Sequence, residues 1–372
     1  MAFTVGVPKE TAARERRVAL VPAVAAKLIS LGARIVMQQG AGAAAGIPDE
    51  AYRAAAAANA EALSFAADAA AALRDADLVL RVQAPSPEEA ALYKKGAVLV
   101  AFLAPHANAA LIEQLRSGGQ TAFAVELIPR ISRAQSMDAL SSQAACAGYA
   151  AVLIGAGHLK RFLPMLTTAA GTIRPAKALI VGAGVAGLQA IATARRLGAM
   201  VEAFDVRSAT KEQVESLGAK FVDTGVKAEG AGGYARELTA DEKAQQSAAL
   251  GKHAALADLV ITTAAIPGRP APKLISRAMV EAMKPGSVLV DLAAETGGNC
   301  ELTTPGEAVQ HGGVTVIGPL NLPSSLAEHA SEMYAKNLLN FTQPWIKDGA
   351  LRIDWTDEVY AGAVVTGDDA KP

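Results

Sequence analysis

The stretch ALIVGAGVAGLQAIATARRLG, residues 178–198, has the order of features that a nucleotide-binding turn requires. ALIV predicts a buried strand, and LQAIATARRLG predicts an amphipathic helix that ends at Gly198. Between them, Gly182 allows a tight turn, Gly184 lets backbone approach a pyrophosphate, and Gly187 lets the helix pack closely on the strand. The start of the helix offers free N–H groups to an anion. The alternative interpretation is a tight turn between strand and helix without a ligand.

A carboxylate follows where a bound dinucleotide would need one. Asp205 ends the run VEAFDV, eighteen residues after Gly187, and is placed to accept hydrogen bonds from an adenosine ribose. Its charge would repel a 2′-phosphate, which favours NAD(H) over NADP(H). Arg207 could instead attract that phosphate, and Asp205 could simply cap the end of a strand. With strand, turn, helix and acid in register, we expect NAD(H).

Strand-like apolar runs alternate with helix-length segments along the whole chain, which predicts an α/β fold. At 372 residues the chain is long enough for two domains. We expect two Rossmann-like domains with parallel sheets, joined by long helices. In the first third, the expected strands are residues 4–7, 34–38, 78–82, 98–103 and 122–126, and the expected helices are residues 22–31, an alanine-rich one from Asp49, and 108–117.

A second series begins at ALIVGAG and continues through VEAFDV, KFVDT, DLVITTA, SVLVDLA and VTVIG, which predicts six strands with helices between them. Residues 141–162 are small and apolar, and predict a long buried helix that bridges the domains. The segment 323–341 is expected to cross back, with one apolar helical face formed by Leu326, Ala330, Met333, Tyr334, Leu338 and Phe341. The predicted domains are residues 1–140 plus 325–372, and residues 141–324. The runs LRIDW and VYAGAVV near the end predict a hairpin.

The composition argues against several classes of partner. The formal net charge of −1 gives no electrostatic reason to expect nucleic acid or anionic lipid. No export signal and no uninterrupted apolar run of about 18 residues is visible, so we expect a cytoplasmic protein without a membrane span. Cys146 and Cys300 have no His or Cys neighbours at ligand spacing, so unpaired thiols and no metal site are expected.

A second polar stretch, RISRAQSMD at residues 130–138, follows an apolar run. Asp138 or Ser136 could cap the helix that follows, but capping explains one residue and leaves the other polar side chains without a role. A nicotinamide carboxamide needs hydrogen-bond partners; Gln135 can donate and accept, and Arg130 can donate. We therefore interpret this stretch as a nicotinamide clasp.

RISRAQSMD, GAGVAGLQAIATARRLGA, DVRSATKEQVESLGAKF, AGGYARE, ITTAAIPGRPAP and DLAAETGGN together resemble one family closely, and the likeness runs almost end to end. This is the NAD(H)-binding domain I, the soluble alpha chain, of proton-translocating NAD(P) transhydrogenase. In that family a domain I dimer binds NADH and sits on membrane domain II, while domain III binds NADP(H). Hydride passes directly between the two nicotinamides, coupled to proton translocation.

The resemblance implies a set of site residues. Arg130, Gln135, Asp138 and Ser141 would lie beside the nicotinamide, and Tyr234 would belong to a mobile loop that folds over bound nucleotide. Glycines at 225, 230, 232 and 233 make movement of that loop plausible, although an ordinary surface loop would look the same. Further residues implied to contact the cofactor are Ile131, Ser132, Ser136, Met137, Gly182, Gly184, Val185, Ala186, Gly187, Asp205, Val206, Arg207, Gly233, Gln246 and Ala265.

Alanine dehydrogenase is implied to share the fold and is the alternative function. That reaction needs an acid–base group and a cation for the substrate carboxylate, which a lysine and a histidine supply in that family. In the matching runs Arg81 stands where the lysine would be, and the place of the histidine near Phe102 and Leu103 is apolar, with His106 a few residues later. A guanidinium stays charged and is a poor proton relay. Hydride transfer between two nicotinamides needs no acid or base.

A third possibility is a nucleotide sensor on the same scaffold, because binding and catalysis share the glycine motif; the clasp argues against it, since a sensor could bind the adenine half alone. The family implies a homodimer, peripheral association with the inner membrane through partner subunits, and little turnover without them. The short polar tail TGDDAKP favours a split form, in which this chain is a separate alpha polypeptide.

Overall fold

The computed structural model describes residues 3–226, 238–265 and 268–367. The chain forms two compact units, Met1–Gln143 with Pro323–Pro372 (unit 1) and Ala144–Leu322 (unit 2). That residues 1–140 with 325–372 fold as an independent domain stays a prediction. Each unit is described by itself below.

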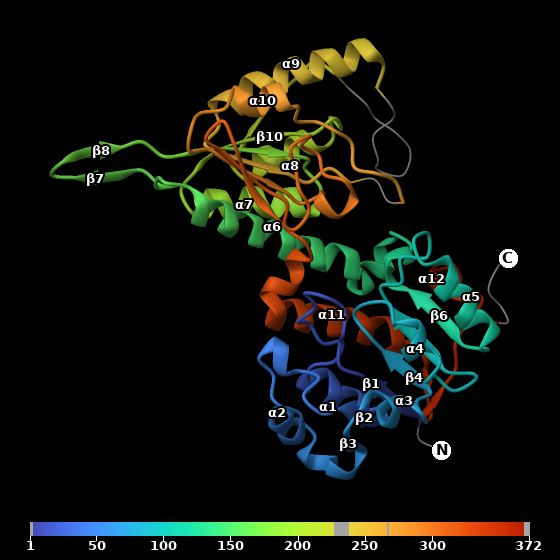
Figure 1. Cartoon of the computed structure of the whole chain (residues 1–372). Helices are drawn as coiled ribbons and strands as arrows, with labels where there is room; N and C mark the ends of the chain where they lie inside the picture. The colour runs from blue at the N-terminus through green and yellow to red at the C-terminus, as the bar shows by residue number, and fades with distance from the viewer. Residues whose placement is uncertain (1–2, 227–237, 266–267, 368–372) are drawn as a thin grey trace. The chain divides into compact units, whose positions relative to one another are not determined.

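Unit 1 is built on a seven-stranded sheet with the order β18-β6-β5-β4-β1-β2-β3, in which only β18 is antiparallel (Figure 1). Its central strands are short apolar runs buried at every position, as expected where helices cover both faces of a parallel sheet. The strands are β1 (Thr4–Val7), β2 (Arg34–Gln38), β3 (Leu63–Ala66), β4 (Leu78–Leu80), β5 (Val98–Ala101), β6 (Thr121–Ala124) and β18 (Val364–Thr366). The helices are α1 (Pro22–Ser30), α2 (Asp49–Ala55), α3 (Ala69–Leu73), α4 (Pro87–Ala90), α5 (Ala109–Ser117), α11 (Ala327–Thr342) and α12 (Glu358–Ala363).

Two features of unit 1 differ from the sequence prediction. The alanine-rich segment after Asp49 contains β3 as well as helix, because LSFA pairs in parallel with β2 at the edge of the sheet. The hairpin expected at LRIDW and VYAGAVV is wrong. Leu351 of the first run pairs instead within a small two-stranded sheet of β16 (Ile346–Lys347) and β17 (Ala350–Leu351). In the second run, Glu358–Ala363 form α12, capped by the Asp357 side chain, and the residues after it form β18, which pairs with β6.

The closing helix packs on the core of unit 1 as predicted, with one correction. Ala330, Tyr334, Leu338 and Phe341 on α11 are buried, whereas Met333 is 36% exposed. The helix continues into a cluster of aromatic rings, in which the Trp345 centroid lies 5.1 Å from that of Phe341. The return to unit 1 runs through the short 3-10 helix Leu322–Leu326, so only one of the two connections is a long helix.

Unit 2 has a seven-stranded sheet with the order β11-β10-β9-β12-β13-β15-β14, parallel except for β14. The chain starts in the middle at β9, moves outward to β10 and β11, and then returns to β12, so the strand order reverses between β9 and β12. The strands are β9 (Lys177–Val181), β10 (Met200–Phe204), β11 (Lys220–Phe221), β12 (Leu259–Thr262), β13 (Val288–Asp291), β14 (Ala308–His311) and β15 (Val314–Ile317). The helices are α7 (Val185–Arg196), α8 (Thr210–Ser216), α9 (Ala240–Leu256) and α10 (Arg277–Glu281).

The long helix α6, Ala139–His158, contains residues of both units. A Cβ at Gly148 would overlap the Ala186 carbonyl oxygen at the start of α7, so glycine permits this contact. The long helix predicted over 141–162 is present but ends at His158, and it is only partly buried, because Tyr149 and Leu153 are exposed. Among the described residues, only α6 is long and apolar enough to cross a membrane by length and composition, and 44% of its apolar window is buried inside the protein.

A hairpin arm absent from the sequence prediction follows α6. Strands β7 (Leu166–Thr168) and β8 (Gly171–Ile173) pair only with each other and are exposed at every residue. Figure 1 shows the arm projecting from the body of unit 2.

Candidate functional site

The glycine-rich turn of unit 2 lies between β9 and α7, at the point where the strand order reverses. Ligands of doubly wound sheets bind at this position, beyond the carboxyl ends of the strands. Gly182 has φ +101°, a conformation that an L side chain rarely adopts, and a Cβ at Gly187 would overlap the Gly182 carbonyl oxygen. Gly184 is the N-cap of α7, with no side-chain cap and open space where its Cβ would be. The turn therefore has the shape, the uncapped N–H groups and the room that a pyrophosphate needs. Val185, the first residue of α7, is 44% exposed.

Asp205 lies directly after β10 and is 9% exposed. Its Oδ2 accepts the Ala183 N–H of the glycine turn at 2.8 Å and the Arg207 Nη2 at 2.8 Å. Its Oδ1 accepts the backbone N–H and the Nε of Arg207, both at 2.9 Å. Burial opposes ionisation, but the Arg207 and Ala183 hydrogen bonds outweigh it and lower the pKa of Asp205. The carboxylate is thus ionised, closes the glycine turn and neutralises Arg207.

Other predicted contact residues of unit 2 differ in their exposure. Gln246 is buried on α9, and Ala265 is exposed shortly after β12. Ala186 and Val206 are half-buried beside the residues described above. Gly233 and Tyr234 lie outside the described residues.

Asn299 is a residue to which the sequence analysis gave no role. It is fully buried, its Oδ1 accepts the Ala264 N–H at 2.9 Å, and its Nδ2 donates to the carbonyls of Ala264 at 2.8 Å and Pro272 at 2.9 Å. One amide therefore fixes both ends of the segment that includes Ala265. The signal in the sequence was an amide after two glycines in ETGGN.

The stretch RISRAQSMD lies in unit 1, where Ser132–Met137 form a 3-10 helix, η4. With three residues per turn, Ile131, Ala134 and Met137 face the core. Ser132, Gln135 and Ser136 are exposed, and the Gln135 amide has no hydrogen-bond partner among the described residues. Arg130, just before this helix, is also exposed. The stretch thus presents an amide and a guanidinium outward from an apolar anchor.

Asp138 also serves as a helix cap, the alternative considered for this stretch. Its Oδ1 accepts the Ser141 N–H at 2.8 Å and its Oδ2 accepts the Ser141 hydroxyl at 2.6 Å, in the first turn of α6. Arg133 is held away from any site role, because its guanidinium forms two hydrogen bonds to Asp357, at 2.8 and 2.6 Å. With Arg133 paired and Asp138 acting as a cap, Gln135 is the side chain of the stretch best placed to contact a ligand, and the exposed Arg130 precedes it.

The strand order of unit 1 also reverses, between β1 and β4, and two buried arginines lie there. Arg17 is 4% exposed and binds Glu15 through Nε and Nη2, at 2.8 and 2.6 Å. Burial alone would raise the pKa of Glu15, but Arg17 outweighs it and lowers the pKa to about 2. Arg81 is 1% exposed and pairs with Glu10 at 3.3 Å and Glu89 at 2.7 Å. The chain's own carboxylates therefore neutralise both cations at this crevice.

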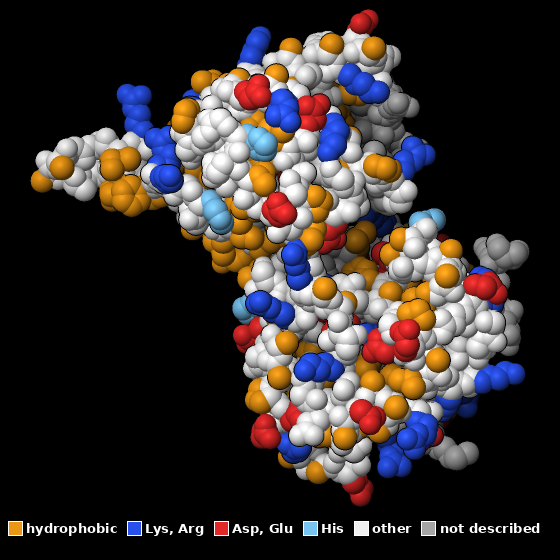
Figure 2. Space-filling view, viewed as in Figure 1, with side chains coloured by type: hydrophobic (Ala, Val, Ile, Leu, Met, Phe, Trp, Pro, Cys, Tyr) orange, Lys and Arg blue, Asp and Glu red, His pale blue; other side chains and the backbone are white. Residues whose placement is uncertain are grey.

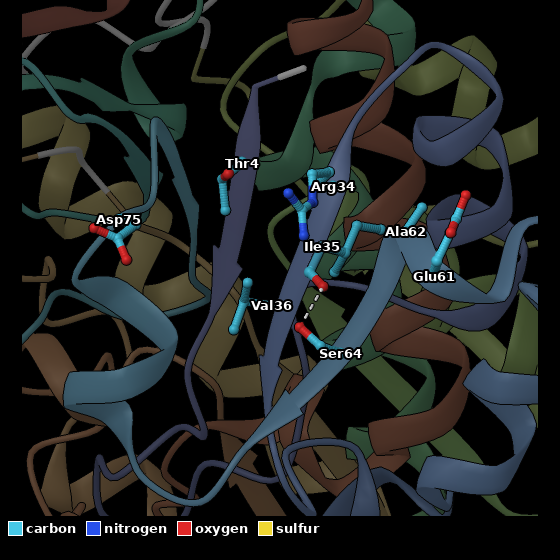
Figure 3. Close-up of a pocket in the computed structure, with 8 residues that line it drawn as sticks. All are labelled: Thr4, Arg34, Ile35, Val36, Glu61, Ala62, Ser64 and Asp75. Atoms are coloured by element: carbon cyan, nitrogen blue, oxygen red, sulfur yellow. Dashed lines mark hydrogen bonds between the residues drawn. The ribbon is translucent and has the colours of Figure 1, made fainter. Parts of the chain in front are cut away.

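A small cavity of about 180 Å³ lies elsewhere in unit 1 (Figure 3). Its walls include the first residues of β1 and β2, Thr4 and Arg34, together with Glu61 and Asp75. It is at the amino ends of the strands, opposite the edge where parallel sheets bind ligands. We do not count it as part of the candidate site.

Comparison with known proteins gives the family. A family model described as alanine dehydrogenase/PNT, N-terminal domain, matches residues 6–147, and one described as alanine dehydrogenase/PNT, C-terminal domain, matches residues 151–370. The chain belongs to the alanine dehydrogenase/PNT family.

Relatives within the alanine dehydrogenase/PNT family carry two kinds of name. A Rhodospirillum rubrum protein named as a portion of NAD(P) transhydrogenase subunit alpha is 50% identical, over 98% of this chain and 97% of its own length. A Mycobacterium tuberculosis alanine dehydrogenase is 33% identical, over 92% of this chain and 86% of its own length. The crystal structure of a transhydrogenase from Sinorhizobium meliloti is 46% identical and superposes with a TM-score of 0.89, covering 99% of this chain and 100% of that one. The predicted α/β fold with two Rossmann-like halves is confirmed, as is the predicted resemblance.

Proposed function

We propose that this chain is the NAD(H)-binding component of a proton-translocating nicotinamide nucleotide transhydrogenase. The observation that carries the proposal is the likeness, over 98% of the chain, to a relative named as a portion of a transhydrogenase alpha subunit. The glycine turn supports it, because Gly184 and the uncapped start of α7 fit a pyrophosphate, and Asp205 fits an unphosphorylated ribose. Residues 1–140 with 325–372 and residues 141–324 would be its two domains.

In this proposal each predicted site residue positions the cofactor. The pyrophosphate would be surrounded by Gly182, Gly184, Val185, Ala186 and Gly187. The adenosine would be contacted by Asp205, Val206 and Arg207, and other regions of the dinucleotide by Gly233, Gln246 and Ala265. Arg130, Ile131, Ser132, Gln135, Ser136, Met137, Asp138 and Ser141 form the clasp, and Tyr234 covers it. Bound NADH supplies a hydride to NADP held on a partner domain III. The chain's own task is to orient the ring, since the transfer needs no acid or base.

The partners follow from the same proposal. A membrane domain II would couple the transfer to proton translocation and hold the chain at the cytoplasmic face of the inner membrane. Alone, the chain would bind NADH with little turnover. No nucleic acid is expected, given the net charge of −1.

A homodimer is included in the proposal, and the hairpin arm supports it. An isolated two-stranded hairpin is marginally stable in water, yet this one exposes Leu166 and Ile173, a cross-strand pair, and the adjacent Met165, which is 64% exposed. Figure 2 shows hydrophobic side chains along the arm and Lys or Arg side chains near its base. We propose that a second copy of the chain covers this apolar surface.

The alternative is an alanine dehydrogenase-like amino-acid oxidoreductase, favoured by the relative at 33% identity. Its substrate carboxylate would need a cation, and Arg17 and Arg81 at the unit 1 crevice are already bound to carboxylates. His106, which could act as an acid or base, is exposed after β5. The ion pairs of Arg17 and Arg81 therefore favour the transhydrogenase component over the dehydrogenase.

Three measurements on the purified chain separate the candidates. NADH binding at least about tenfold tighter than NADPH binding, without NAD reduction by alanine, supports the transhydrogenase component. Reduction of NAD on addition of alanine would establish the dehydrogenase instead. Equal affinity for NADH and for ADP-ribose, which lacks the nicotinamide, would favour a sensor of the adenine half.

A further inference from the structure

The carbonyl group of Ser136, within the clasp, is held by two amides of α11. Asn337 Nδ2 donates to it at 2.9 Å and Asn340 Nδ2 at 3.0 Å. The two asparagines are three residues apart and so lie on one face of the helix. Ser136 is preceded by Gln135, whose amide points outward without a partner among the described residues. The two amides therefore restrain the backbone one residue after Gln135.

Asn337 is the better buried of the two, at 8% exposed. Its Oδ1 accepts the Ser142 hydroxyl at 2.7 Å, in the first turn of α6. One amide thus joins α11 to the clasp through its donor and to α6 through its acceptor. Aspartate in this place would lack the donor, and leucine would lack both groups.

A series of hydrogen bonds, buried at Arg17 and Gln143 and part-buried at Ser142, leads from Arg17 to the Asn337 amide. A guanidinium only donates, so Arg17 Nη1 fixes the Gln143 Oε1, 2.8 Å away, as an acceptor. Gln143 Nε2 must then donate, which it does to Ser142 Oγ at 3.1 Å and to the Ala330 carbonyl at 3.1 Å. The Ser136 carbonyl can only accept, so it fixes Asn337 Nδ2 as the donor and Asn337 Oδ1 as the acceptor. The Ser142 hydroxyl has two acceptors within reach, the Ala139 carbonyl at 3.1 Å and, closer, Asn337 Oδ1 at 2.7 Å.

The start of this chain of hydrogen bonds stays charged over the physiological range. Glu15 holds Arg17 in place with both carboxylate oxygens, and it also accepts Gln83 Nε2 at 2.8 Å. Its pKa of about 2 keeps it ionised. A hydrogen-bonded network of this kind favours one arrangement of its side chains.

We propose that Asn337 is a positioning residue for the nicotinamide ring. It holds the Ser136 backbone, and so the Gln135 amide, in the orientation that the carboxamide of bound NADH requires. This inference rests on the proposed function and adds a residue that contacts neither cofactor nor reacting atoms. A small displacement of a clasp is costly, because binding of the ring depends on its geometry.

The test compares NADH with ADP-ribose, which has the same adenosine and pyrophosphate but no nicotinamide. We expect Asn337→Leu in the full chain to raise the Kd of NADH by about tenfold and that of ADP-ribose by less than about twofold. Asn340→Leu, which removes one of the two bonds to the same carbonyl, should give a smaller effect with the same selectivity. Asn59→Leu, at an exposed position of unit 1, is the matched control and should change neither affinity.

Equal weakening of NADH and ADP-ribose by Asn337→Leu would show a structural role only and overturn the inference, as would an unchanged NADH affinity. If Asn337→Leu does not fold, the Kd values of NADH and ADP-ribose are measured for Asn337→Ser and Asn340→Leu instead, with the same criteria. A wild-type chain that binds NADH no better than ADP-ribose would contradict the proposed function itself. The two failures are therefore distinguishable.

Discussion

At the scale of single residues, Asp205 has a structural and a proposed binding role at once. Its carboxylate closes the glycine turn through the Ala183 N–H and holds Arg207, while the proposal also assigns it the ribose. Removing this buried carboxylate should also destabilise the chain by about 1–3 kcal/mol, because the Ala183 N–H and Arg207 lose an acceptor.

Asp205→Asn is therefore the sharper variant, since it keeps the size and removes the charge. We expect NADH affinity to fall by at least about tenfold and the free energy of unfolding to fall by about 1–3 kcal/mol. NADH fluorescence titration and urea unfolding measure the two effects. Glu215→Gln, at an exposed position of α8, is the control. An unchanged NADH affinity would refute the role of Asp205 in binding.

Glu15 makes the stability of the chain depend on pH. Its pKa is lowered from 4.5 to about 2, so its contribution is present above pH 4.5 and is lost as the pH falls toward 2. Between pH 6 and pH 3 the wild type should lose about 2 kcal/mol more than Glu15→Gln, from this group alone. Urea unfolding at the two pH values measures this difference.

The exposed Glu50 provides the control for that experiment, because Glu50→Gln should lose stability in parallel with the wild type. If Glu15→Gln lost as much free energy of unfolding as the wild type on going from pH 6 to pH 3, the Glu15–Arg17 pair would not contribute as described.

At the scale of elements, the sequence predicted what local pattern determines. Continuous apolar runs marked the parallel strands, and three glycines marked the turn before α7. The sequence could not reveal what non-local pairing decides. The strand β3 was hidden in an alanine-rich segment because it is only four residues long, LSFA, and none of its residues is fully buried. The arm was missed because its two strands are only three residues long and cover no core.

The same reasoning applies to the site. The glycine motif and its acid were readable because they are close in sequence. Asn337, about two hundred residues after the stretch it supports, was not, since only the folded chain brings α11 against η4.

Alanine substitutions at two glycines of α6 test how closely this helix packs on α7. Gly148→Ala places a methyl against the Ala186 carbonyl and should lower the free energy of unfolding by about 1–3 kcal/mol. Gly157→Ala has open space and should raise it by about 0.5–1 kcal/mol through helix propensity. Urea unfolding of both variants measures this, and an equal gain from Gly148→Ala would show that α6 does not pack tightly there.

The exposed apolar side chains of the β7–β8 arm lead to a prediction about dimerisation. Replacing Met165 and Ile173 together by serine removes apolar surface without removing a core contact, so we expect a monomer where the wild type is a dimer. Size-exclusion chromatography with light scattering reads the mass directly. Leu256→Ser, at a residue 55% exposed on α9, is the control and should leave the dimer intact. A dimer that survives the double change would place the interface elsewhere.

At the scale of the whole molecule, two doubly wound units differ in what lies at their switch points. In unit 2 the glycine turn is open and lined with N–H groups. In unit 1 the cations Arg17 and Arg81 are already bound by Glu15, Glu10 and Glu89. This asymmetry is why we assign the pyrophosphate of one dinucleotide to unit 2.

The most direct test follows the hydride itself. The purified chain is mixed with NADH that carries deuterium at the hydride-donating carbon and with a separately made NADP-binding domain of a transhydrogenase, loaded with NADP. Mass spectrometry should find the deuterium on NADPH with none lost to water, and no transfer when either protein is omitted. NADPH without the label, or no NADPH in the complete mixture, would contradict the account.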